Sequence, residues 1–470
     1  RSRVIASARS VRINTTITEG CDIETRKDSL VYTNAKNQNN GNSIGSHYKP
    51  LILKSSAKKL YQELSEKTGG ISFQIHKEEI ERAMPISLFM SEPATKNFYT
   101  EKVTVDSTSK TESILKIDET MSTSKTMIII KTIDDAIFPI IKLIDPNGNI
   151  VTKDKNVAIS SLSTIVAYTI DNPIVGEWKV SLSQGSSEYL IKGFSQSKFN
   201  IVGVDVLEVA PINIRGIELK PVDGNPIVGE KLFLQIELTQ NPSYLSMSFI
   251  RDDQTVIIEP SLSFVNGSKA TYEASFTVPD ESFHIKLTGL INESQFQRES
   301  QLNINPTAID LSLDEPIGII GSPIHAVQTE NKSFNLHIAN RMPHTATFLL
   351  NSNSLQNYSV SIQDQITVPK NQTVAIPVIV SIPGDAKVGS IDELMIFAED
   401  INNESNSNYK IVNLVVNNGT GTFYSDNACS TSITSTTISS GNSSSAIYFR
   451  STLANQSLTL VFNSSELLGD

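Results

Sequence analysis

The sequence is poor in several residue types, and each scarcity excludes a class of protein. Its 470 residues include only two cysteines, Cys21 and Cys429, which fall in different predicted domains, so a fold held together by disulfides is not expected. No apolar run approaches the roughly eighteen residues that cross a bilayer, so we expect no membrane span in this chain. The longer apolar runs, IFPIIKLI and VAIPVIVSIP, suit buried strands.

Basic residues are outnumbered as well. The chain has 39 Lys and Arg against 50 Asp and Glu, a net charge of −11, which argues against a nucleic-acid backbone as partner. The acidic residues are spread along the chain and mainly predict solubility. The chain starts without Met and shows no signal peptide, and we expect it to begin inside a domain.

Motifs for catalysis or metal binding are scarce. GNSIG, residues 41–45, matches the G-x-S-x-G pattern around Ser43, with His47 close by, but it lacks the preceding strand and following helix of a nucleophile elbow. Glu19 and Asp22 flank a predicted strand end, where ligands of open sheets bind, although solvated loop acids are the simpler interpretation. None of the histidines has the spacing of a zinc site: His47, His76, His284, His325, His337 and His344. We therefore expect no enzyme, no metal and no cofactor.

Two acidic segments are interpreted as loops. DPNGN, residues 145–149, begins like a calcium loop, but Ile150 occupies the position that needs glycine, so a β-turn is predicted. DETMS, residues 118–122, loosely matches D-x-S-x-S with Thr120 at the third position. It lies between strand-like segments and predicts a loop or an edge strand.

The N-terminal part combines helical and strand patterns. Val11, Ile13 and Ile17 alternate as in a strand, and Ile71, Phe73 and Ile75 do so again. A helix is predicted before the second strand, ending at Thr68-Gly69-Gly70, from the spacing of Ala57, Leu60, Tyr61 and Leu64. A short helix is predicted in KEEIERAM, residues 77–84. Residues 1–85 therefore indicate part of an α/β layered domain.

After Met84 strand alternation replaces helical spacing. Examples are KLFLQIEL, with Leu232, Leu234, Ile236 and Leu238 on one face, and TYEASFTV, with Tyr272, Ala274, Phe276 and Val278. Many short strands separated by turns such as DPNGN and VDGNP predict a mainly β chain of tandem immunoglobulin-like or fibronectin-like sandwiches. Trp178, the only tryptophan, is predicted to anchor a core. The predicted sandwiches cover 86–207, 208–308 and 309–417, followed by a partial Ig-like module at 418–470.

The segment VRINTTITEGC, the polar loop after it and LYQELSEKTGGISFQI resemble the end of a von Willebrand factor type A domain, whose final strand precedes a helix ending in TGG. KIDETMSTSKTMIII, IKLIDPNGNI and VGEWKVSLSQG resemble the segments after this domain in hemicentin-like matrix proteins and calcium-activated chloride channel regulators. IANRMPHTATFLL and the run from ITVPKNQ to MIFAE are similar to a later sandwich of these proteins. FYSDNACSTSITSTTISSGNSSSAIYF resembles an Ig-like repeat of surface proteins.

The resemblance implies an extracellular adhesion or matrix protein that binds a protein ligand or matrix component. The metal-binding residues of the family would all precede Arg1, so no residue of this chain is expected to inherit them. The alternative is an accessory region of a secreted enzyme or channel regulator. Eleven Asn-x-Ser/Thr sequons are candidate glycosylation sites, although a chain rich in Asn, Ser and Thr forms many by chance. They are Asn14, Asn266, Asn292, Asn331, Asn357, Asn371, Asn403, Asn418, Asn442, Asn455 and Asn463.

Overall fold

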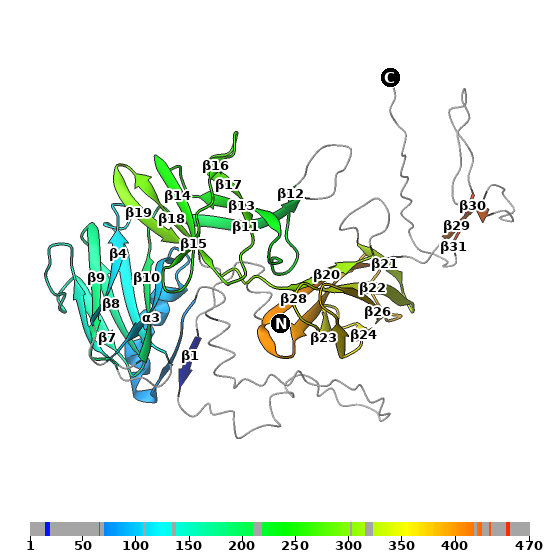
Figure 1. Cartoon of the computed structure of the whole chain (residues 1–470), viewed down its shortest axis with the longest axis horizontal. Coiled ribbons are helices and arrows are strands. Elements are labelled where there is room, and N and C mark those ends of the chain that lie inside the picture. The colour runs from blue at the N-terminus through cyan, green and yellow to red at the C-terminus, as the bar shows by residue number, and fades with distance from the viewer. Residues whose placement is uncertain are drawn as a thin grey trace. The chain divides into compact units, whose positions relative to one another are not determined.

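A computed structural model of the chain is composed mainly of β-strands, as predicted (Figure 1). It describes residues 15–18, 65, 70–106, 110–133, 138–185, 187–209, 219–300, 303–314, 323–417, 421–424, 432–433 and 448–451. The chain divides into two compact units, of which the first comprises Arg1–Glu208 and Gly229–Asn305 and the second comprises Val209–Val228 and Pro306–Asp470. No helix in the described part of the chain has the length and apolar character to cross a membrane.

The first sandwich is built from two antiparallel sheets. One sheet has the strand order β3-β10-β5-β8-β7 and the other has the order β4-β9-β6. The strands are β3 (Lys96–Val105), β4 (Lys110–Ile117), β5 (Lys125–Thr132), β6 (Ile140–Ile144), β7 (Val157–Ser161), β8 (Ile165–Asp171), β9 (Gly176–Ser183) and β10 (Ser187–Ser195). Alternate residues of both sheets meet in one core, which includes Trp178. The predicted core position of Trp178 is confirmed, and its indole N–H donates to the carbonyl of Ile174 at 2.8 Å.

A third layer covers the outer face of the larger sheet. It consists of β2 (Ser72–Ile75), the 3₁₀ turn η2 (Lys77–Glu79) and helix α3 (Ile80–Ser91). Ile71, Ile86 and Phe89 of this layer pack on Ile129 of β5 and Phe194 of β10. Strand β5 is therefore buried on both faces, which explains its continuous apolar run MIII, residues 127–130. β2 also pairs in parallel with β1 (Thr15–Thr18), so the second predicted strand forms and the first forms over 15–18, whereas Val11 and Ile13 lie outside the described residues.

Helix α3 extends farther than the sequence predicted. The pattern suggested a short helix ending near Met84, whereas α3 continues through Pro85 to Ser91. Proline disfavours a helix interior, but burial of Ala83, Ile86 and Phe89 against the sheet outweighs that local cost. The predicted domain boundary at residue 86 consequently falls inside α3.

The second sandwich begins with β11 (Ile201–Val209), inside which the predicted boundary at 208 falls. Its remaining strands are β13 (Lys231–Leu238), β14 (Tyr244–Ile250), β15 (Val256–Ile258), β16 (Ser263–Phe264), β17 (Thr271–Thr277), β18 (His284–Ile291) and β19 (Ser294–Glu299). One sheet contains β11-β13-β17-β16 and the other contains β15-β14-β18-β19. The predicted inward residues of β13 are all buried. Across the core, the ring of Phe249 on β14 packs against that of Phe276 on β17, with 4.9 Å between the ring centroids.

The second unit contains an Ig-like sandwich. Its sheets have the orders β20-β22-β26-β24 and β21-β28-β27-β23-β25, and both contribute to one core. The strands are β20 (Ile309–Leu313), β21 (Ile324–Val327), β22 (Asn331–Asn340), β23 (Ala346–Ser354), β24 (Ser359–Ser361), β25 (Gln365–Val368), β26 (Thr373–Ser381), β27 (Ile391–Asp400) and β28 (Asn403–Asn417). A small sheet of β29 (Gly421–Tyr424), β30 (Ser432–Ile433) and β31 (Tyr448–Ser451) follows in the sequence.

The connecting segment 219–228, which contains β12 (Leu219–Pro221), also belongs to the second unit. Its VDGNP turn rests on β28, where the backbone N–H of Asn225 donates to Oδ1 of Asn408 at 2.8 Å. Gly224 has φ +104°, and a Cβ there would lie 2.5 Å from both that oxygen and the Tyr409 carbonyl. Glycine is therefore required at this turn by conformation and by space.

Candidate functional site at the junction of two sandwiches

Several predicted candidates lie outside the described residues. They are Cys21, Cys429, Ser43, His47, Glu19, Asp22, the helix predicted at 57–64 and the sequon residues Asn14, Asn418, Asn442, Asn455 and Asn463. Within the described ranges, no three His, Cys, Asp or Glu side chains group as metal ligands do. The described histidines, His76, His284, His325, His337 and His344, therefore take part in no such group.

DPNGN forms the predicted β-turn between β6 and the segment after it. The amide of Gly148 donates to the Asp145 carbonyl at 3.0 Å, and Gly148 has φ +84°. The Asp145 carboxylate accepts the backbone N–H groups of Asn147 and Asn149. Burial alone would raise the pKa of Asp145, but hydrogen bonds from this turn outweigh it and hold the pKa below its usual value. The carboxylate that suggested a calcium loop thus organises its own turn.

DETMS forms the predicted loop, between β4 and β5, but Asp118 in this loop has a role that the pattern did not reveal. Asp118 is completely buried, and its Oδ2 lies 2.6 Å from Nη1 of Arg298 in the second sandwich. The other oxygen, Oδ1, accepts the backbone N–H of Thr120 at 2.9 Å. The loop of the first sandwich thus presents an oriented carboxylate to the second.

Arg298, on β19, uses all five of its N–H donors inside this junction. Nη1 donates to Asp118 and to the carbonyl of Gln297. Nη2 donates to Thr120 Oγ1 at 2.8 Å and to Ser197 Oγ at 2.9 Å. Nε donates to the Phe199 carbonyl at 2.8 Å. A guanidinium has no further donors, so this buried cation is fully satisfied.

The partners of Arg298 belong to three separate segments. Asp118 and Thr120 follow β4, Ser197 and Phe199 connect β10 to β11, and Gln297 is the neighbour of Arg298 on β19. The Phe199 ring also lies beneath the guanidinium, 5.3 Å from Cζ to the ring centroid. We name these side chains, with Arg298, the arginine cluster. It fastens the first sandwich, the connecting segment and the second sandwich together.

A second set of polar contacts lies beside the arginine cluster. Gln254, in the turn after β14, donates to the Thr100 carbonyl of β3 and to Oε1 of Glu299 at 2.8 Å. Lys286 donates to Oε1 of Gln254 at 2.7 Å. The backbone N–H of Lys102 donates to the Asp252 carbonyl at 2.6 Å, so β3 is bonded directly to the second sandwich.

Two titratable side chains at these contacts, Glu299 and His284, have pKa values far from their ordinary ones. Burial raises the pKa of Glu299 to about 8, although hydrogen bonds from Gln254 and Gln297 oppose the shift. Burial also lowers the pKa of His284 to about 4, against the opposing effect of Asp252. Both groups are consequently held in their neutral forms near neutral pH.

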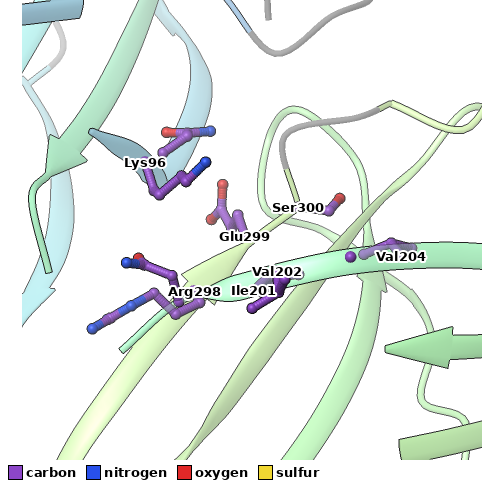
Figure 2. Close-up of a pocket in the computed structure, with 10 residues that line it drawn as sticks. Lys96, Ile201, Val202, Val204, Arg298, Glu299 and Ser300 are labelled. Atoms are coloured by element: carbon purple, nitrogen blue, oxygen red, sulfur yellow. The ribbon is translucent and has the colours of Figure 1, made fainter. Parts of the chain in front are cut away.

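A polar pocket lies at the edge of the junction (Figure 2). Lys96 and Asn97 line it from the first sandwich, the start of β11 lines it with Ile201 and Val202, and Glu299 lines it from β19. Figure 2 shows that its lining comes from strands of both sandwiches. The pocket exists only because the two sandwiches are docked.

The six sequon asparagines within the described residues share one property. All of them are exposed and occupy turns or strand ends: Asn266, Asn292, Asn331, Asn357, Asn371 and Asn403. Asn292, Asn357 and Asn371 adopt positive φ, which asparagine tolerates in tight turns. Their positions leave each side-chain amide accessible from solvent.

Sequence reasoning missed the arginine cluster. Asp118 and Arg298 are separated by 180 positions, and nothing in either local pattern relates them. The available signal was weak: FQRES places a charged pair, Arg298 and Glu299, in a strand next to the apolar Phe296. Such a charge pair is usually solvent-facing, and here the neighbouring sandwich covers it.

A family model described as the VWA7 Ig-like domain matches residues 321–418, about a fifth of the chain. The match agrees with the sandwich of the second unit, and the chain therefore carries an Ig-like domain there. No curated protein matches the chain.

Solved structures with some similarity have low identity. A FixG-related protein from Vibrio parahaemolyticus is 13% identical, with 23% of this chain and 96% of that chain covered and a TM-score of 0.19. A pair of tandem Ig domains of titin is 7% identical, with 46% of this chain and 98% of that chain covered and a TM-score of 0.15. A mutant of Salmonella alpha-2-macroglobulin is 7% identical, with 70% of this chain and 32% of that chain covered and a TM-score of 0.24. At these TM-scores the similarity carries no argument about this chain.

Proposed function

We propose that this chain is part of an extracellular or cell-surface protein of the adhesion or matrix type. Its Ig-like sandwiches would form a non-catalytic stalk, preceded by residues of a von Willebrand A-like α/β domain. The observation that carries the proposal is the Ig-like domain at 321–418, matched by a family model whose description joins it to VWA7. The parallel β1–β2 pair supports the α/β part, because it forms a sheet of its own, and purely parallel sheets occur almost only in α/β proteins.

The docked junction of the first two sandwiches is consistent with a load-bearing stalk. Flexibly linked domains need few buried contacts between them, whereas here a buried arginine and several interdomain hydrogen bonds join the sandwiches. The exposed sequons are consistent with an extracellular location, where glycans would project from turns.

Adhesion can be tested with the full chain immobilised on a surface. We expect cells to attach to the folded chain, or a matrix protein to bind it, and attachment to be lost after the chain is denatured. A chain with Arg341→Ala, which alters only a surface ion pair, serves as the matched control and should behave as wild type. Equal attachment to folded and denatured chains would refute specific adhesion.

The second candidate, an accessory region of a secreted enzyme, makes a different prediction. Hydrolytic activity of the full chain that disappears when Ser43 is replaced by alanine would favour it over the stalk. Attachment without such activity would favour the adhesion proposal.

A further inference from the structure

Two buried titratable groups face each other inside the junction. His284 is on β18 and Glu299 is at the end of β19, with Nε2 of His284 4.0 Å from Oε2 of Glu299. Among the described residues, neither of these two atoms has a hydrogen-bond partner. His284 retains 6% of its surface and Glu299 retains 2%. Each of these buried atoms lacks a hydrogen-bond partner in the described part of the chain. The free energy of burying the pair therefore depends on how many protons the two side chains hold.

The first sandwich is what covers this pair. Thr100 of β3 accepts a hydrogen bond from Gln254, whose amide also donates to Glu299, and the Thr100 backbone itself bonds to Glu299. The Lys102 amide bonds to Asp252, and Asp252 lies 3.6 Å from Nδ1 of His284. Undocking the sandwiches would therefore return both groups to water.

Charged groups of both signs surround the pair. The second sandwich contributes Asp252 and Lys286, and Arg298 lies next to Glu299 but is committed to Asp118. The first sandwich contributes Lys192 on β10, Lys116 on β4, and Lys96, Tyr99, Glu101 and Lys102 on β3. Lys192 and Lys286 disfavour a proton on His284, whereas Asp252 favours one. These opposing charges leave burial as the main influence on both groups.

We propose that the His284–Glu299 pair makes the docking of the first two sandwiches pH-sensitive, because the junction closes on a pair that holds one proton. Loss of this proton places a buried negative charge in the junction, which the nearby Lys286 offsets only in part. The sandwiches then separate more readily. This property does not depend on the adhesion role proposed above.

The direction and size of the effect follow from the two pKa values. In the docked state the pair keeps one proton between about pH 4, where His284 titrates, and about pH 8, where Glu299 titrates. Separated groups have ordinary pKa values of 4.5 and 6.5, so an undocked pair has lost this proton above pH 6.5. Docking therefore takes up one proton between pH 6.5 and 8 and weakens as the pH rises. At tenfold per pH unit, the docking constant should fall by about 30-fold over this window.

Hydrogen exchange of the full chain can measure this constant. The reporter is the Lys102 amide, which is bonded across the junction, and the reference is the Ile338 amide in the core strand β22 of the second unit. Each exchange rate is divided by the intrinsic rate at the same pH. We expect protection of the reporter, relative to the reference, to fall by about 30-fold from pH 6.5 to 8.

Two variants identify the groups responsible. Glu299→Gln mimics the neutral acid, so its docking should be constant from pH 6.5 to 8 and should weaken below pH 6.5, where only His284 titrates. Glu259→Gln, at an exposed position of the same sandwich, is the matched control and should follow wild type. His284→Asn leaves Glu299 alone, and its docking should weaken from pH 4.5 upward.

Three results would overturn the proposal. The first is wild-type protection that does not change between pH 6.5 and 8. The second is a Glu299→Gln chain with the wild-type dependence. If Glu299→Gln fails to fold, His284→Asn decides, because a dependence still confined above pH 6.5 in that variant contradicts the shared proton.

Discussion

Replacing Arg298 by alanine should be among the most damaging single changes in the first unit. The substitution removes a buried cation that donates five hydrogen bonds and leaves the Asp118 carboxylate buried without its counter-charge. Breaking a buried ion pair from one side costs about 3–5 kcal/mol of stability. Exposed pairs contribute about 0–1 kcal/mol, so Arg341→Ala, at the exposed pair with Asp310, is the control.

The measurement is denaturant unfolding of the full chain. Trp178 is the only tryptophan and lies in the first sandwich, so its fluorescence follows the part of the protein that holds Asp118. We expect Arg298→Ala to lower the free energy of unfolding by about 3–5 kcal/mol. The loss is limited by the free energy with which the two sandwiches dock. Far-UV circular dichroism should then show the second sandwich unfolding in a separate transition.

A double variant tests the cause. If the cost comes from an uncompensated charge, Asp118→Asn added to Arg298→Ala should restore part of the lost stability, so the two changes are not additive. A loss no larger than that of Arg341→Ala would refute the reasoning. So would strict additivity of the two changes, which would show that Arg298 and Asp118 do not act as a pair.

Three further predictions concern other parts of the chain. Trp178→Ala should lower the stability of the first sandwich by about 3–5 kcal/mol in calorimetry, since it empties a core position and removes the bond to Ile174; an unchanged transition would contradict its role. Gly224→Ala should destabilise the second unit by about 1–3 kcal/mol in calorimetry, because it combines a positive φ with contact to Asn408, whereas Gly267→Ala has positive φ but open space and should cost less. The full chain secreted from eukaryotic cells should carry N-glycans at Asn371, detected by mass spectrometry after glycosidase treatment; an unmodified Asn371 would count against its accessibility.

Local pattern was sufficient for much of the fold. The alternation in KLFLQIEL predicted which residues of β13 are buried, and the turn chemistry of DPNGN predicted its β-turn. Both features depend on residues within one strand or turn, so the information is contained in a few neighbouring positions. The end of α3 was missed because its stability comes from the sheet beneath it, which lies elsewhere in the sequence.

The sequence by itself determined the β-rich class of the chain, the core role of Trp178 and the turns between strands, since periodicity and turn residues act over short distances. Only the tertiary structure decided that β2 and α3 pack on the outer face of the first sandwich and that Arg298 and Glu299 are interior residues. A strand carrying Arg and Glu has the pattern of a solvated face until a second domain covers it. Its burial is settled by docking, which joins side chains 180 positions apart and leaves no local signature.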